Sequence, residues 1–138
     1  MRSNEDVAEF MFSTGYEGKV NVWEIFLKKS SVQSSLMSST ICPQLKFSFF
    51  PDDSQHSPDQ IGYELYALAV WQPKRGTEDA MILSAGSQGM VYFTEMFSYE
   101  TVRKVKIHGD SINCMLIDEN ILFTGGYEGQ IKLTVCLI

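Results

Sequence analysis

The chain has 138 residues, of which 44% are hydrophobic and 20% are charged, so it can build a packed core and is not broadly disordered. Its length fits one domain or part of one. The net charge of -6 and the pI near 4.8 exclude a surface built to neutralise phosphates, so we expect no nucleic-acid partner. Aromatic residues make up 12% of the chain, which favours β structure.

Three cysteines, Cys42, Cys114 and Cys136, are far apart and lack the paired spacing of a zinc site, so we expect no metal. Each lies in or beside an apolar stretch, where we expect a buried, reduced thiol and hence a cytoplasmic protein. The longest apolar run, residues 65–71, is much shorter than the ~20 residues of a membrane helix. We therefore expect neither a membrane span nor a signal peptide.

Three segments of the chain align without gaps and predict three copies of one β-hairpin. They read FMFSTGYEGKVNVW from Phe10, MILSAGSQGMVYFT from Met81 and ILFTGGYEGQIKLT from Ile121. Each has an apolar run, a Ser or Thr, two glycines around two polar residues, and then alternating apolar positions, which is typical of two antiparallel strands. The second glycine stands where a tight hairpin needs positive φ. These turn glycines are Gly18, Gly89 and Gly129.

The strands around each hairpin can be followed along the chain. After the first hairpin we expect a serine-rich insertion at 28–40, a strand within 41–50 and a loop at 51–60. The second hairpin lies between an apolar strand at 64–71 and an outer strand at 100–107. The basic residues of that outer strand favour protection of a sheet edge, and the alternative is binding of an acidic partner.

These residues resemble the WD40 repeat, whose blades are four-stranded antiparallel sheets. The resemblance places His108 at the position of the family's histidine, Thr124 at its hydroxyl position and Glu128 where an aspartate is usual. Trp23 followed by Glu24 matches the Trp-Asp pair. The other copies have Ser13 or Ser84 at the hydroxyl position and Glu17 or Gln88 at the acidic position, while Thr94 and Thr134 replace the tryptophan. The stretch His108–Gly125 also resembles blades of large ciliary and flagellar WD-repeat proteins, which implies a cilium as a second possible location.

We therefore predict an all-β fold, part of a WD40-like β-propeller over residues 1–138, with about three blades. Blade one covers 10–50, blade two 64–107 and blade three 111–138, with the first and last incomplete. Ten strands are too few for a closed propeller of four-stranded blades. Three explanations stay open: a fragment of a longer propeller, closure by oligomerisation, or completion of a propeller begun by another polypeptide. Exposed blade faces predict that the isolated chain oligomerises or aggregates.

No pattern in the sequence predicts catalysis. The GYEG and GSQG turns lack the Lys-Ser/Thr of a phosphate-binding loop, so we expect no cofactor. His56 lies in an acidic loop and is expected to be solvated, and His108 has a structural role in the resemblance. The sequence thus favours a protein that is not an enzyme.

The resemblance instead implies recognition of other proteins or of further WD-repeat blades. It places the hairpin turns and the loops between blades on one face, where tyrosines would suit a protein interface. The predicted partner-binding residues are Tyr16, Glu17, Ser87, Gln88, Tyr127, Glu128, His56 and Asp110. The predicted structural residues are His108, Thr124, Trp23, Gly18, Gly89 and Gly129. The alternative function is a structural assembly element whose open blade edges pair with another chain, for example in a ciliary or axonemal complex.

Overall fold

The computed structural model describes residues 6–28, 43–52, 63–73 and 80–137, with the side chains of 6–8 and 26–28 left out. These residues form ten β-strands and no helix, so the predicted all-β class is confirmed. Within these ranges, accordingly, no long apolar helix is present that could cross a membrane. The predicted insertion, apart from Lys28 at the end of a strand, and the predicted site residue His56 lie outside the described residues.

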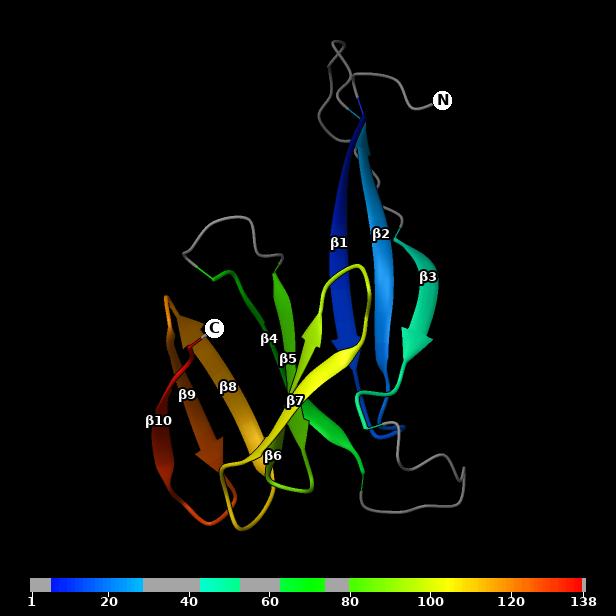
Figure 1. Cartoon of the computed structure of the whole chain (residues 1–138). Helices are drawn as coiled ribbons and strands as arrows, with labels where there is room; N and C mark the ends of the chain where they lie inside the picture. The colour runs from blue at the N-terminus through cyan, green and yellow to red at the C-terminus, as the bar shows by residue number, and fades with distance from the viewer. Residues whose placement is uncertain (1–5, 29–42, 53–62, 74–79, 138) are drawn as a thin grey trace, which may run out of the picture. The chain divides into compact units, whose positions relative to one another are not determined.

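The strands form three antiparallel sheets, one for each expected blade (Figure 1). Blade one is ordered β1-β2-β3 and contains β1 (Asp6–Thr14), β2 (Val20–Lys28) and β3 (Gln44–Phe49). Blade two is ordered β4-β5-β6-β7 and contains β4 (Leu65–Trp71), β5 (Met81–Gly86), β6 (Met90–Glu95) and β7 (Thr101–Lys106). Blade three is ordered β10-β9-β8 and contains β8 (Ile112–Asp118), β9 (Ile121–Gly126) and β10 (Ile131–Val135).

The chain divides into two compact units. The first holds Met1–Ser13 and Asn21–Ser48, and the second holds Thr14–Val20 and Phe49–Ile138. The tip of the β1–β2 hairpin therefore belongs to the second unit, together with blades two and three.

Within the first unit, polar side chains join the three strands of blade one. The Ser13 hydroxyl on β1 accepts a hydrogen bond from Trp23 Nε1 on β2 at 2.9 Å. On β3, the Ser48 hydroxyl donates to Asn21 Oδ1 at 2.6 Å, and Asn21 Nδ2 in turn lies 3.4 Å from the Ser13 hydroxyl. Strand β1 begins at Asp6, before the expected start of the blade at residue 10, because its backbone pairs along the equally long β2.

The core of the second unit lies between blades two and three. From blade two it takes Leu83 and Phe93, and from blade three it takes Ile112 and Leu122; all four are at most 5% exposed. Such burial stabilises a folded protein by about 1.5–3 kcal/mol for each large apolar side chain, before the entropy cost of ordering it. The two sheets are thus held face to face by an apolar contact, as stacked repeats require.

Asn120, in the turn between β8 and β9, adds a polar connection to this core. Its side-chain oxygen accepts a hydrogen bond from Trp71 Nε1 on β4 at 3.1 Å. Its backbone oxygen accepts from the Cys136 N–H, just after β10, at 2.7 Å. One turn residue therefore ties the inner strand of blade two to the outer strand of blade three.

The expectation that the cysteine thiols are buried is correct for Cys136 and wrong for Cys114. Cys136 is buried in the core, where burial raises the pKa of its thiol. Cys114 is exposed, because it lies on the face of blade three that points away from blade two. Cys42 lies outside the described residues.

The hairpin turn glycines have the positive φ angles that tight turns need: 78° at Gly18, 70° at Gly89 and 85° at Gly129. They differ in what surrounds them. A Cβ at Gly89 would collide with the carbonyl oxygens of His108 and Asp110, whereas a Cβ at Gly129 would meet nothing within 4 Å. The turn geometry requires glycine at both positions. Close packing against the next loop is a second reason for glycine at position 89, and this reason is absent at position 129.

Substituting these two glycines by alanine separates the two requirements. Gly129→Ala should lower the free energy of unfolding by about 1–2 kcal/mol, the cost of a left-handed conformation for a residue with a Cβ. Gly89→Ala should cost clearly more, because its Cβ also displaces the His108 carbonyl. Urea unfolding followed by circular dichroism measures both values. Equal losses would contradict the packing role of Gly89.

Candidate partner-binding site

Backbone hydrogen bonds gather the three hairpin turns and two connecting loops at one end of the second unit. The Leu65 N–H donates to Gly15 O in the first turn, and the Ser87 N–H in the second turn donates to Glu64 O. The His108 N–H donates to Gly89 O, and the Tyr127 N–H in the third turn donates to Ser111 O. We call this surface the turn face: residues 15–18, 63–64, 86–89, 108–111 and 126–129.

Seven of the eight predicted partner-binding residues can be placed, and all seven lie on the turn face. Tyr16 and Tyr127 project most strongly, with 82% and 73% of their surfaces exposed. Glu17 is also exposed and forms an ion pair with Lys19 at 2.9 Å. The remaining residues are Ser87 and Gln88, which are partly buried, and Asp110 and Glu128, which are exposed. The eighth, His56, is outside the described residues.

A tyrosine that sequence reasoning missed lies beside Tyr16. The rings of Tyr16 and Tyr66 on β4 pack edge to face, with their centroids 5.9 Å apart. Burial, followed by the negative charge of Glu64, raises the pKa of the Tyr66 phenol. No local pattern of the sequence would have found it, because Tyr66 lies at an irregularity of the β4–β5 register, exposed between the buried Leu65 and Ala67.

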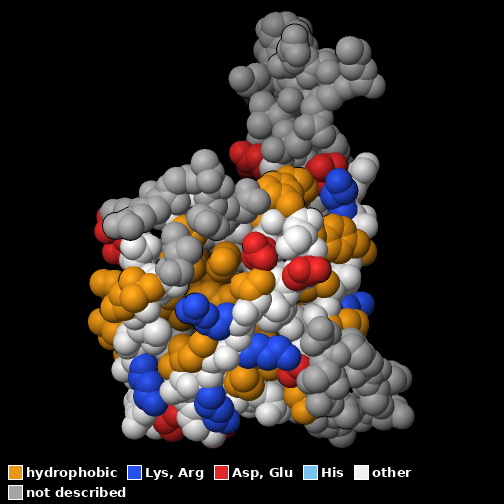
Figure 2. Space-filling view, in the orientation of Figure 1, with side chains coloured by type: hydrophobic (Ala, Val, Ile, Leu, Met, Phe, Trp, Pro, Cys, Tyr) orange, Lys and Arg blue, Asp and Glu red, His pale blue; other side chains and the backbone are white. Residues whose placement is uncertain are grey.

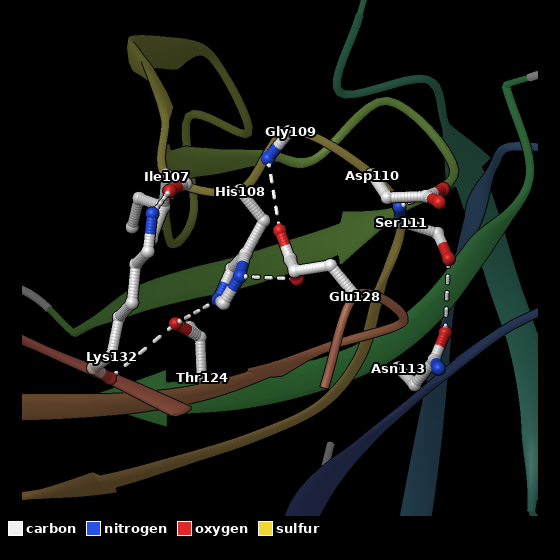
Figure 3. A network of polar contacts seen from close by, with 9 residues as sticks. All are labelled: Ile107, His108, Gly109, Asp110, Ser111, Asn113, Thr124, Glu128 and Lys132. Atoms are coloured by element: carbon white, nitrogen blue, oxygen red, sulfur yellow. Dashed lines mark hydrogen bonds and ion pairs between the residues drawn. The ribbon is translucent and has the colours of Figure 1, made fainter. Parts of the chain in front are cut away.

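Glu128 has a second set of contacts that holds blade three together (Figure 3). Its Oε1 lies 2.8 Å from His108 Nδ1, and its Oε2 accepts a hydrogen bond from the Gly109 N–H at 3.1 Å. The other ring nitrogen, His108 Nε2, lies 2.8 Å from the Thr124 hydroxyl on β9. We call His108, Thr124 and Glu128 the His108 network. It joins the β7–β8 loop to β9 and to the β9–β10 turn.

The order carboxylate, imidazole, hydroxyl is also that of a hydrolase triad. Here both the imidazole and the hydroxyl are buried: His108 and Thr124 are each 1% exposed. A nucleophile must reach its substrate, and the Thr124 oxygen is enclosed by His108 and by the Lys132 carbonyl at 3.5 Å. The network therefore supports the turn face and does not form an open reaction site.

The equivalent position in blade two lacks such a network. Ser84 aligns with Thr124, is 1% exposed, and its hydroxyl has no hydrogen-bond partner among the described residues. Thr94, which aligns with the tryptophan position, bonds instead to the Thr101 hydroxyl at 3.0 Å. Asp52, in the loop that leads into blade two, has a different set of contacts. It accepts hydrogen bonds from the Tyr92 hydroxyl at 3.3 Å and from Lys104 Nζ at 3.2 Å.

The chain is similar to known proteins in fold and not in sequence. No family model matches the chain, and no curated protein sequence does. The WD40 β-propeller domain of Doa1 superposes with a TM-score of 0.54 at 11% identity, over 98% of this chain and 39% of that one. A humanized mutant of the Chaetomium thermophilum Polycomb Repressive Complex 2, bound to the inhibitor GSK126, gives a TM-score of 0.56 at 13% identity, over 98% of this chain and 29% of that one.

The chain thus spans less than half the length of these structures, and the likeness concerns the fold. Among the residues that the structure describes, no group of three His, Cys, Asp or Glu side chains is placed to hold a metal ion. The three antiparallel sheets have the fold of WD40 β-propeller blades, with sheets that stay open among the described residues.

Removing the Thr124 hydroxyl tests the His108 network against a control at the same position of the repeat. Thr124→Val should lower the free energy of unfolding by about 1–3 kcal/mol, because it leaves a buried ring nitrogen without a partner. Ser84→Ala should be neutral or stabilising, because it removes a buried hydroxyl that has no partner among the described residues. Chemical unfolding of both variants gives the values, and a larger loss for Ser84→Ala would contradict this account.

The network also predicts how stability depends on pH. Burial disfavours the charge of Glu128, but the hydrogen bond to His108 and further backbone hydrogen bonds outweigh it and hold the pKa of this carboxyl below its ordinary value of 4.5. A carboxyl with a lowered folded pKa stabilises the fold fully above its ordinary pKa, and this contribution is lost as the pH falls through the folded value. Unfolding midpoints measured between pH 7 and pH 3 should therefore fall less for Glu128→Gln than for the unsubstituted protein. Parallel curves would rule out a contribution from Glu128.

Proposed function

We propose that the chain is a non-catalytic protein–protein interaction module that binds its partner through the turn face. The observation that carries this proposal is the pair of strongly exposed tyrosines, Tyr16 and Tyr127, on turns fixed by backbone hydrogen bonds. Tyrosine gives a large contact area with few rotatable bonds and a polar tip, so little entropy is lost on binding.

The surroundings of these tyrosines favour a partner with basic residues. Glu17, Glu64 and Asp110 lie on the same face, and the whole chain carries a net charge of -6. A cationic side chain could contact the Tyr16–Tyr66 pair and a carboxylate together, and both contacts are attractive. The fold agrees with this function, because one similar structure is part of a multi-protein complex.

Rigidity of the turns supports recognition as well. Glu128 is exposed on the turn face while its carboxylate is bound to His108 and Gly109, so it positions the turn that carries Tyr127. We assign Glu128 a supporting role, and Tyr16 and Tyr127 the direct contact. A cytoplasmic location, and the ciliary location expected from the resemblance of residues 108–125, stay predictions that protein localisation in cells would test.

Quantitative affinity purification with the full chain tests the proposal. The variant Tyr16→Ala/Tyr127→Ala should lose specific partners, because a buried interface tyrosine contributes about 2 kcal/mol or more to binding. Val102→Ala is the matched control, since Val102 is 51% exposed on β7, outside the turn face. The recovered partners should be the same for the control and the unsubstituted chain. Recovery that is equal for all three proteins would contradict a role of the turn face.

A further inference from the structure

Strand β7 forms the outer edge of blade two and carries a cluster of positive charge. Arg103, Lys104 and Lys106 are all exposed, and no acidic residue lies between Thr101 and Ile107. This cluster is opposite in sign to the net charge of the chain, which is -6. In Figure 2, Lys and Arg side chains gather over the middle and lower part of the molecule, where Figure 1 draws β7 in front. We call residues 103–106 the basic edge.

The backbone of the basic edge is oriented to accept a further strand. Among the described residues, β7 has a neighbouring strand, β6, on one side only. In an antiparallel pair, opposite residues alternate between those that exchange two hydrogen bonds and those that exchange none. The Ile107 N–H donates to Gly89 O at 2.9 Å, so the next pair, Lys106 and Met90, is of the second kind. The N–H and C=O of Lys106 therefore point away from β6.

A β-bulge sets the length of this edge. Phe93 is opposite Arg103 and Thr94 is opposite Thr101, so Val102 has no opposite residue on β6. A bulge interrupts the regular ladder and bends the strand. The regular part of the edge is therefore residues 103–106, which is enough for pairing with a short strand.

The charges of the basic edge exclude some strands and favour others. Like charges directly opposite each other on neighbouring strands are destabilising, whereas opposite charges attract. The lysines therefore keep a second copy of β7 away, which is the edge protection expected from the sequence. The same lysines favour a strand that carries carboxylates, so one set of charges both rejects the wrong strand and selects the right one.

One carboxylate already contacts this cluster. Asp52, which follows β3 along the chain, places its Oδ1 3.2 Å from Lys104 Nζ. Arg103 and Lys106 form no ion pair within the described ranges, and Lys106 Nζ donates to the neutral Gln88 carbonyl at 3.0 Å. The edge thus binds a carboxylate at one position and has two further positive charges whose described neighbours do not neutralise them.

We propose that the basic edge binds an extended acidic segment of another protein, which pairs with β7 as a fifth strand of blade two. Main-chain hydrogen bonds give such strand addition its affinity, and alternate side chains give its specificity. Lys104 and Lys106 lie on one face of the sheet, so the segment should carry Asp or Glu at every second position. The positions between them lie on the side of Val105, which packs against the core, and should be apolar. The basic edge shares no residue with the turn face.

Fluorescence anisotropy with the full chain tests the proposal. The probe is a labelled octapeptide that alternates glutamate and valine, and the comparison peptide has four glutamates followed by four valines. The alternating peptide should bind more tightly, because all of its carboxylates lie on the face of Lys104 and Lys106. Lys106→Glu should weaken this binding about tenfold, since it replaces an attraction by a repulsion. Lys19→Glu, an equal change of net charge directly before β2, should leave the affinity unchanged.

Two further substitutions of Lys106 separate strand pairing from charge. Lys106→Ala and Lys106→Pro both remove the ammonium, but only proline also removes the N–H that points away from β6. Lys106→Pro should therefore bind the alternating peptide about fivefold more weakly than Lys106→Ala, the loss expected for one hydrogen bond. In the unsubstituted chain, hydrogen exchange of the amides of residues 103–106 should slow when this peptide is added. Circular dichroism checks that the variants are folded.

Several outcomes would overturn the proposal. One is the absence of binding at about 1 mM of the alternating peptide. Equal affinity for the two peptides, or equal affinity of the proline and alanine variants, would show that charge alone attracts the peptide. Tighter binding of a single-stranded oligonucleotide with the same number of charges would assign the basic edge to a nucleic acid. If Lys106→Pro does not fold, unchanged hydrogen exchange in the unsubstituted chain would exclude strand pairing.

Discussion

The apolar contact between blades two and three is the interaction on which the rest of the second unit depends. A single antiparallel sheet is one layer thick and cannot bury both of its faces. Leu83 and Phe93 become buried only because Ile112 and Leu122 on the next sheet cover them. The same contact brings the second and third hairpin turns onto one surface, so the part of the turn face that carries Tyr127 exists only when these two sheets are packed.

Much of this architecture could be predicted from the sequence because the information is local and repeated. An apolar run, a hydroxyl residue and a turn glycine recur three times, and each copy forms a hairpin in the structure. The turn glycines have positive φ because a tight hairpin turn needs it, and such a turn spans only about four residues of the chain. Local patterns of this kind do not depend on how the sheets are placed.

The features that were missed depend on contacts between residues far apart in the chain. Trp71 bonds to Asn120 and Tyr92 to Asp52, and neither pair has a spacing that a repeat pattern would reveal. The edge-to-face contact of Tyr16 with Tyr66 likewise joins the turn of one repeat to the inner strand of the next. Repeats predict which positions are equivalent, whereas the unpartnered hydroxyl of Ser84 shows that equivalent positions need not have equivalent partners.

The sequence of β10 has a consequence for how its register is chosen during folding. Its outward residues are Ile131, Leu133 and Val135, while Lys132 and Thr134 point to the side of blade two. Because a one-residue slip exchanges the two faces of a strand, hydrophobic burial alone would favour the slipped pairing. The native register must be selected by polar contacts, and Lys132 supplies one through its ammonium, which donates to Ile107 O at 2.8 Å. Together with the β9–β10 turn, in which the Gly126 N–H donates to Gln130 O at 3.0 Å, this contact aligns a strand whose hydrophobic residues lie on its outward side.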